Sequence, residues 1–235
     1  MIKKILPLLL IISFWSCDPA ALQQILDSEG GGLTTSEIGQ GLKSALNIGI
    51  DKGVSRLSAS NGYFKSPYKI LLPPEARKVT QKLQGIPGFS NIENIVLEKI
   101  NRGAEDAAKR AKPIFVKAIK QMTFKDAMGI LMGGDGAATD YLHRSTYTSL
   151  YNEFNPVIVQ SLDKFQARKY WSDAVTAYNR IPFVDKVNTK LDDYVTNQAL
   201  KGLFAMVQKE ETKIRHNISA RKTDLLRRVF AKQDK

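Results

Sequence analysis

The chain is poor in the residues that most often carry metal or nucleophilic chemistry. It has one cysteine and two histidines among 235 residues. The histidines, His143 and His216, lie far apart, and no H-E-x-x-H or paired E-x-x-H spacing occurs. No G-x-S-x-G motif surrounds a serine, and a lone cysteine cannot form an internal disulfide. We therefore expect no cofactor and no metal, with an all-carboxylate metal site as the one open alternative, and we favour a protein that is not an enzyme.

Long apolar runs are also scarce, and the clearest one stands at the start of the chain. Two lysines precede an apolar run over residues 5–12, and Ser16 stands directly before the single cysteine, Cys17. This order is typical of a secretory signal, and the run is short for a transmembrane helix. Ser-Cys after an apolar run resembles the bacterial lipobox, in which the cysteine is diacylated and becomes the first residue of the mature chain. The alternative is a plain signal peptide with an incidental cysteine.

The lipobox interpretation divides the chain into three parts. We expect a signal peptide over 1–16, a lipid-anchored tether over 17–32 that ends in three glycines, and a helical domain over 33–235. Asp18 resembles the inner-membrane retention signal of enteric bacteria, but that rule does not hold across phyla, and we favour the outer membrane over the inner one. The expected location is thus the bacterial cell envelope, with the lipid held in the membrane.

The net charge limits the partners that this domain can have. It is +12 for the whole chain and falls to +10 if the two lysines of the signal are removed. A basic body beside a membrane favours an anionic envelope component, such as phospholipid headgroups, lipopolysaccharide phosphates or acidic wall polymers. Another envelope protein is the other possible partner. Nucleic acid fits the charge but not the compartment, so we expect none.

Apolar periodicity predicts an all-α fold, a single bundle-like domain of eight or nine helices. Thr34 and Glu37 have capping-box spacing and begin a helix whose apolar face contains Gly49 and Gly53, which suggests that another helix approaches closely there. Residues 62–74 predict one short extended segment or hairpin. Further helices are expected from Pro74, after Ser90 with Glu93 as a capping box, and over 114–122, 127–132, 137–154, 157–166, 172–179, 186–215 and 225–230. Thr123 and Asp126 have N-cap and N3 spacing before the helix over 127–132, and Asn155-Pro156 is expected to end one helix and begin the next.

The stretch MGGDGAATDYLHRST over 132–146 looks most like a site for chemistry. A nucleotide-binding phosphate loop needs a lysine and a hydroxyl after its last glycine, and this stretch has alanines. It also lacks the alternating oxygen ligands of a calcium loop. We favour a joint between two helices, in which Gly133 or Gly134 adopts a left-handed conformation and Asp135 caps the second helix. The alternative is an anion bound at the N-terminus of that helix.

Two polar patterns are more informative. Glu98, Asn101, Arg102 and Glu105 share one helix face, and we favour a solvated ladder of ion pairs over an inward, fully hydrogen-bonded network. Near the C-terminus, Glu211 and Arg215 form an i,i+4 pair. The basic residues of that region are Arg215, Arg221, Arg227 and Arg228. We expect them to dock on an acidic stripe of another helix; the alternative is that they stay in water and meet an anionic surface.

Several motifs resemble one family in matching order over nearly the whole mature chain. They are KILLP (69–73), LEKINRGAE (97–105), MTFKDAMGIL (122–131), AATDYL (137–142), YVTNQALKGLF (194–204) and the region 210–230. The series is similar to the bacterial domain-of-unknown-function family numbered 4197, whose members are typically secreted or lipid-anchored. The resemblance implies no reaction. The positions it marks as candidates are Asn101, Arg102, Glu105, Asp126, Gly133, Thr139, Tyr141, Glu211, Arg215, Arg221 and Thr223.

Together these observations favour a non-catalytic envelope lipoprotein that binds a partner or an anionic component. The first alternative is an enzyme that acts on envelope lipid or glycan through carboxylates such as Glu105 and Asp126, which would have to converge in one concave pocket. The second is a purely architectural subunit. The arrangement of the polar side chains at 98–105 and 211–223 distinguishes best among these hypotheses.

Overall fold

The computed structural model describes residues 33–164, 166–187, 190–231 and 234. No strand occurs among these residues, and the predicted all-α fold is confirmed. The predicted signal, the tether and Cys17 lie outside them. The helices are α2 (Thr35–Ser58), α3 (Pro74–Leu83), α4 (Ile92–Ala108), α5 (Ala111–Gln121), α6 (Phe124–Met132), α7 (Ala137–Lys164), α8 (Ala167–Asn179), α9 (Asp192–His216), the 3₁₀ turn η1 (Ile218–Ala220) and α10 (Asp224–Phe230).

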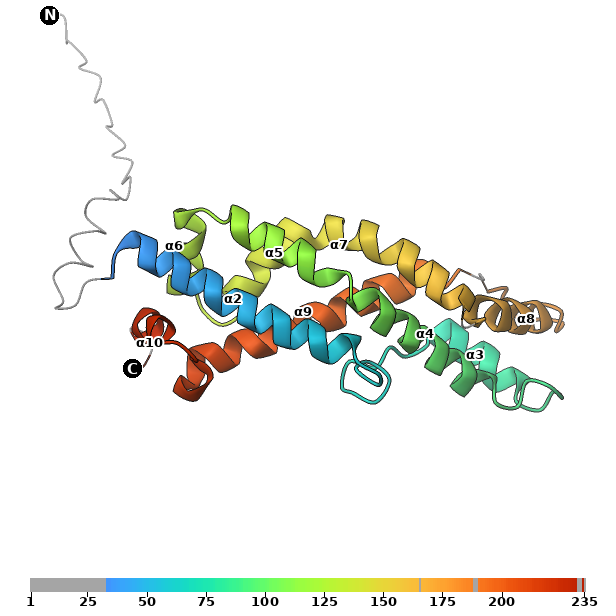
Figure 1. Cartoon of the computed structure of the whole chain (residues 1–235). Coiled ribbons are helices and arrows are strands. Elements are labelled where there is room, and N and C mark those ends of the chain that lie inside the picture. Colours follow the sequence, from blue (N-terminus) through green and yellow to red (C-terminus); the bar gives the residue numbers. More distant parts are fainter. Residues whose placement is uncertain (1–32, 165, 188–189, 232–233, 235) are drawn as a thin grey trace, which may run out of the picture.

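The helices form an elongated bundle (Figure 1). The long helices α2, α7 and α9 run along it, and α9 packs against both α2 and α7. Helices α4 and α5 follow one another along the same direction. Helices α3 and α8 lie at one end of the molecule, whereas α6, α10 and the first described residues lie at the other. In the described part of the chain, no helix combines the length and the apolar character needed to cross a bilayer.

Two of the predicted capping boxes are confirmed. The Thr34 backbone N–H donates to Glu37 Oε2 at 2.8 Å, and the Glu37 N–H donates back to Thr34 Oγ1 at 3.2 Å. Thr123 and Asp126 form the same reciprocal pair at the start of α6. Each box satisfies backbone donors that the first turn of a helix leaves without a partner.

The third predicted capping box is wrong. Helix α4 begins after Asn91, without a side-chain cap, so Ser90 lies outside the capping position. The carboxylate of Glu93 instead accepts a hydrogen bond from the Thr80 hydroxyl at 3.0 Å. This bond joins α4 to α3. The Glu93 carboxylate, which the sequence pattern predicted would cap the start of α4, therefore makes a tertiary contact instead.

The predicted break at Asn155-Pro156 is also wrong, because α7 continues through Pro156. A proline inside a helix removes the hydrogen bond to the carbonyl four residues earlier, here that of Asn152. Both residues lie on the exposed side of α7, where water can hydrate this carbonyl. The buried face is continuous across the proline, since Phe154 and Ile158 are both fully buried, and this packing holds the helix together.

Helix α9 begins at Asp192 and not near residue 186 as predicted. The side chain of Asn179, at the end of α8, accepts a hydrogen bond from the Val187 N–H at 3.0 Å and donates to the Val187 carbonyl at 3.2 Å. These bonds hold the backbone of Val187 in a non-helical conformation. Helix α8 begins earlier than predicted, at Ala167, after Gln166 in a left-handed conformation.

The predicted close approach at Gly49 and Gly53 is confirmed. A Cβ atom at Gly53 would lie 3.1 Å from Met206 Cγ, and one at Gly49 would lie 3.6 Å from Glu210 Cβ. Both neighbours belong to α9, so these glycines mark the contact between α2 and α9. The segment predicted to be extended or a hairpin over 62–74 forms neither a strand nor a hairpin: residues 59–68 form turns, and residues 69–73 have no regular secondary structure.

A glycine pair in α2 provides a test of how α10 packs. A Cβ atom at Gly41 would lie 2.7 Å from Val229 Cγ2, whereas Gly39 has open space. We expect Gly41→Ala to lower the free energy of unfolding by about 1–3 kcal/mol, because the branched Val229 side chain cannot easily move aside.

Gly39→Ala is the control and should stabilise the protein by about 0.5–1 kcal/mol. Urea unfolding measures the free energy change of both variants. Adding Val229→Ala to Gly41→Ala should recover part of the lost stability. Equal effects of the two glycine substitutions would contradict the close packing of α10 against Gly41.

Candidate functional site

The turn between α6 and α7 is completed by a carboxylate from α9. Glu211 Oε1 accepts a hydrogen bond from the Ala138 N–H at 3.0 Å, and Oε2 accepts from the Thr139 N–H and hydroxyl at 2.9 and 2.8 Å. These N–H groups belong to the first turn of α7, where donors lack helical partners and the helix dipole favours negative charge. The place where an external anion could bind is therefore filled by the protein's own Glu211.

Arg215 completes the other side of the same turn. Its Nε donates to Glu211 Oε1 at 2.9 Å, and its terminal nitrogens donate to the carbonyls of Ile130 and Gly133 at 2.7 and 3.2 Å. Those carbonyls lie at the C-terminal end of α6, where acceptors lack helical partners and positive charge is stabilised. Glu211 and Arg215 are only 8% and 4% exposed. One buried ion pair on α9 thus holds the end of α6 and the start of α7.

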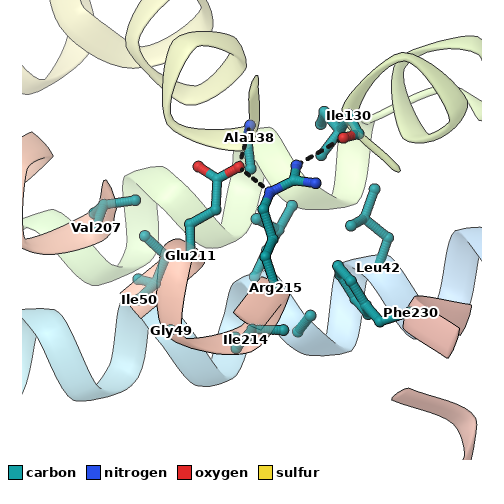
Figure 2. A pocket seen from close by; sticks show the side chains of 12 residues that line it. Leu42, Gly49, Ile50, Ile130, Ala138, Val207, Glu211, Ile214, Arg215 and Phe230 are labelled. Atoms are coloured by element: carbon teal, nitrogen blue, oxygen red, sulfur yellow. Dashed lines mark hydrogen bonds and ion pairs between the residues drawn. The ribbon is translucent and has the colours of Figure 1, made fainter. Parts of the chain in front are cut away.

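Figure 2 shows Glu211 and Arg215 projecting from α9 beside a small cavity. The cavity has a volume of about 20 Å³, which is room for roughly one water molecule. Apart from the ion pair, its walls are apolar or glycine; they include Leu42, Ile50 and Phe230. Such a space is too small for an organic substrate, so this cluster serves cohesion.

The prediction that Asp135 caps α7 is wrong, because Glu211 takes that role. Asp135 instead pairs with His216 at 2.8 Å, and both side chains are exposed. The left-handed glycine of the turn is Gly136, with φ of +92°, and neither Gly133 nor Gly134. Gly133 is required for space, since a Cβ atom there would lie 2.7 Å from that of Ala137.

The α4 stripe forms the second polar cluster, and it faces inward in part. Glu105 is 4% exposed, and its Oε1 accepts hydrogen bonds from the N–H groups of Tyr63 and Phe64, both at 3.1 Å. Its Oε2 accepts from Arg102 Nη1 at 2.9 Å. Burial, followed by the Glu105 charge, raises the pKa of the Tyr63 hydroxyl. The favoured prediction of a solvated ladder is wrong for Glu105, and the alternative of a hydrogen-bonded inward network is confirmed for it.

The other members of the stripe attach the same non-helical segment to α4. Asn101 is fully buried; its side chain accepts from the Ile70 N–H at 2.8 Å and donates to the Ile70 carbonyl at 2.9 Å. Arg102 donates to Ser60 and to Asn61. The hydrogen bond to Glu105 raises the pKa of Arg102. Only Glu98 matches the solvated ladder, since it meets Arg102 at 3.4 Å with an exposed side chain. The stripe therefore fixes residues 60–70 to α4.

The basic residues after α9 dock on the protein, but not on an acidic helix stripe. Arg221 is buried and donates to the carbonyls of Ile214 and Arg215 at 3.0 and 2.8 Å, and to both carboxylate oxygens of Asp234 at 2.7 Å. Thr223 caps α10 by accepting from the Leu226 N–H. Arg227 and Arg228 lie on the exposed side of α10, where Arg227 pairs with Asp224 at 2.7 Å and Arg228 pairs with the single carboxylate of Glu37 on α2 at 3.4 Å. The partners of the buried arginines are thus mainly backbone carbonyls at a helix end.

Asp126 and Tyr141 stand apart from both clusters. Asp126 belongs to the capping box of α6, and the hydrogen bond from the Thr123 hydroxyl holds the pKa of this carboxyl below its usual value. The Tyr141 hydroxyl donates to the Ala118 carbonyl at 3.5 Å, and burial raises its pKa. Asp126 is partly exposed in the first turn of α6 and Glu105 is buried against residues 63–64, so these two carboxylates do not converge in one pocket.

The candidate residues thus form two separate groups. Glu98, Asn101, Arg102 and Glu105 belong to one, and Gly133, Thr139, Glu211 and Arg215 to the other. Among the described residues, no hydrogen bond or ion pair connects residues 98–105 with 211–223. Nor does the described chain contain a group of three or more His, Cys, Asp and Glu side chains that could hold a metal ion.

Sequence reasoning missed a third feature, a cleft beside Trp171 on α8. Its lining comes from α3, α8 and the residues before α9. The single signal in the sequence is a tryptophan and a tyrosine seven residues apart on one helix face, a spacing that core packing explains equally well.

Comparison with known proteins gives one match. A family model described as "Protein of unknown function (DUF4197)" matches residues 32–231. No curated protein and no solved structure matches the chain.

Proposed function

The chain belongs to the DUF4197 family, and from that premise we propose that it is a non-catalytic binding or structural module of the bacterial cell envelope, anchored by acylated Cys17. The anchor lies in the outer membrane in preference to the inner one. The partner is an anionic envelope component or another envelope protein. The domain supplies the folded body that meets this partner.

One observation carries the non-catalytic part of the proposal. The two buried carboxylates with the most hydrogen bonds, Glu105 and Glu211, each meet two backbone N–H groups and one arginine. A general acid or base needs a free position near a substrate. Here the lone pairs are occupied by the fold itself, which favours cohesion over bond-making. The absence of a shared pocket for Glu105 and Asp126 argues against the alternative of a carboxylate-based hydrolase.

The position of the first described residues supports a membrane-facing end. They lie beside α6 and α10 (Figure 1). Elements at this end expose the apolar side chains of Phe124, Met132 and Ile218. Lys125 on α6 and Arg227 and Arg228 on α10 are exposed as well, and the two arginines also meet the carboxylates of Asp224 and Glu37. Apolar tips among basic groups suit a surface of anionic lipid headgroups.

The anchor is tested by metabolic labelling. Cells that express the full chain should incorporate radioactive palmitate into it, and the protein should sediment with membranes. Cys17→Ala should abolish the label and release the protein to the soluble fraction, because a thiol is needed for acylation and one or two acyl chains supply most of the membrane affinity.

A matched variant separates the anchor from the basic surface. Replacing Arg227 and Arg228 by glutamine should leave the palmitate label unchanged. A wild-type chain that takes up no label and stays soluble would remove the anchor from the proposal.

A further inference from the structure

A cleft lies between α3, α8 and the residues that precede α9. Its volume is about 360 Å³, within the range of small-molecule pockets. The lining includes two aromatic side chains, three lysines and one carboxylate, together with apolar groups. It consists of Pro73, Ala76, Lys78, Trp171, Tyr178, Asp185, Lys186, Val187, Lys190 and Leu191. Helices α3 and α8 lie at the end of the bundle opposite to the first described residues (Figure 1).

The indole of Trp171 is the unusual group in this wall. Trp171 is 1% exposed, and its Nε1 has no hydrogen-bond partner. Among the described residues, it is the one buried side-chain nitrogen or oxygen in that condition. A buried donor without an acceptor costs about 1–3 kcal/mol, so native proteins rarely leave one. An acceptor oxygen supplied from the cleft would remove this cost.

The charges of the lining indicate which acceptor fits. Lys78 and Lys186 are exposed at the cleft, and Asp185 is the single acidic group in the lining. Donors and cations therefore outnumber acceptors, which favours a carboxylate, sulfonate or phosphate. Pro73, Val187 and Leu191 add an apolar surface for the rest of such a molecule.

One residue of the wall before α9, Val187, is held in place by α8. Asn179 holds the backbone of Val187 with two hydrogen bonds, at 3.0 and 3.2 Å. A pocket whose wall is fixed before binding loses less free energy in ordering.

We propose that this cleft binds a small organic anion, with an oxygen that accepts from Trp171 Nε1–H, a charge that faces Lys78 and Lys186, and an apolar part against Val187 and Leu191. This proposal states which class of ligand the binding module proposed above would bind, and it rests on that proposed binding role. It does not depend on the lipid anchor, so a chain that takes up no palmitate would not contradict it.

The test uses 8-anilinonaphthalene-1-sulfonate, which joins an anionic group to apolar rings. The chain has two tryptophans, and Trp15→Phe in the full chain leaves Trp171 as the single indole. Titration with the probe should shift the one indole ¹H–¹⁵N signal in a saturable way. Excitation of Trp171 should produce sensitised emission from the probe with the same midpoint.

Charge variants then locate the bound probe. Lys78→Glu combined with Lys186→Glu should weaken binding about tenfold, because two nearby attractions become repulsions. The control is Lys52→Glu combined with Lys201→Glu, which makes the same change in net charge at exposed positions on α2 and α9. It should change the midpoint less than about twofold.

Two results would overturn the proposal. One is an indole signal that does not move at saturating probe, which means that a water molecule alone meets the Trp171 N–H. The other is an equal loss of affinity in the two double variants, which means that the probe responds to net charge and not to this cleft.

Discussion

Replacement of Arg215 by methionine is expected to lower the free energy of unfolding by about 3–5 kcal/mol, the cost of removing one partner from a buried ion pair. The substitution leaves Glu211 buried without its countercharge. It also leaves the carbonyls of Ile130 and Gly133 without the donor that they meet at the end of α6. Methionine has a similar length and flexibility, so loss of packing adds little.

Urea unfolding followed by circular dichroism measures this loss. Arg168→Met is the matched control, because Arg168 pairs with Asp163 at the same distance of 2.9 Å while both side chains are about half exposed. Exposed pairs contribute about 0–1 kcal/mol. If Arg215→Met cost no more than Arg168→Met, the buried pair would not be the tie between α6 and α7 that its geometry indicates.

Replacement of Glu105 by alanine should cost about 2–4 kcal/mol. The N–H groups of Tyr63 and Phe64 would lose their acceptor, and each such buried donor costs about 1–3 kcal/mol. Glu105→Gln should cost less, because its amide oxygen can still accept both backbone bonds, and the loss is confined to the ion pair and hydrogen bond with Arg102. The same unfolding measurement ranks the two variants.

Glu98→Ala is the control for Glu105. Both carboxylates meet Arg102, but Glu98 is exposed and holds no backbone group. We expect a change of less than about 1 kcal/mol. A cost of Glu105→Ala as small as that of Glu98→Ala would mean that the segment over residues 60–70 does not depend on this carboxylate.

The sequence allowed much of the fold to be predicted, because local rules decide it. Apolar periodicity located the helices, and the side chains of Thr34 and Thr123 marked two helix starts correctly. The errors arose where a tertiary contact outweighed a local preference. Continuous packing carried α7 through Pro156, and the side chain of Asn179 holds Val187 outside the helix.

The sequence indicated which residues matter more readily than it indicated which partners they contact. The spacing of Glu211 and Arg215 indicated an ion pair, which the structure contains. Their other partners lie in a turn more than seventy residues earlier in the chain, and no local pattern records such a contact. Asn101 likewise meets Ile70, which a helix-face argument cannot find. Burial of Glu105 depends on the segment that covers it, so its exposure could not be judged from α4 alone.

The dependence of the α6–α7 turn on Glu211 and Arg215 has a consequence for the order in which the protein matures. A nascent chain that has already produced both of those helices still lacks the two side chains that join them. The joint can form only after nearly the entire polypeptide has left the ribosome.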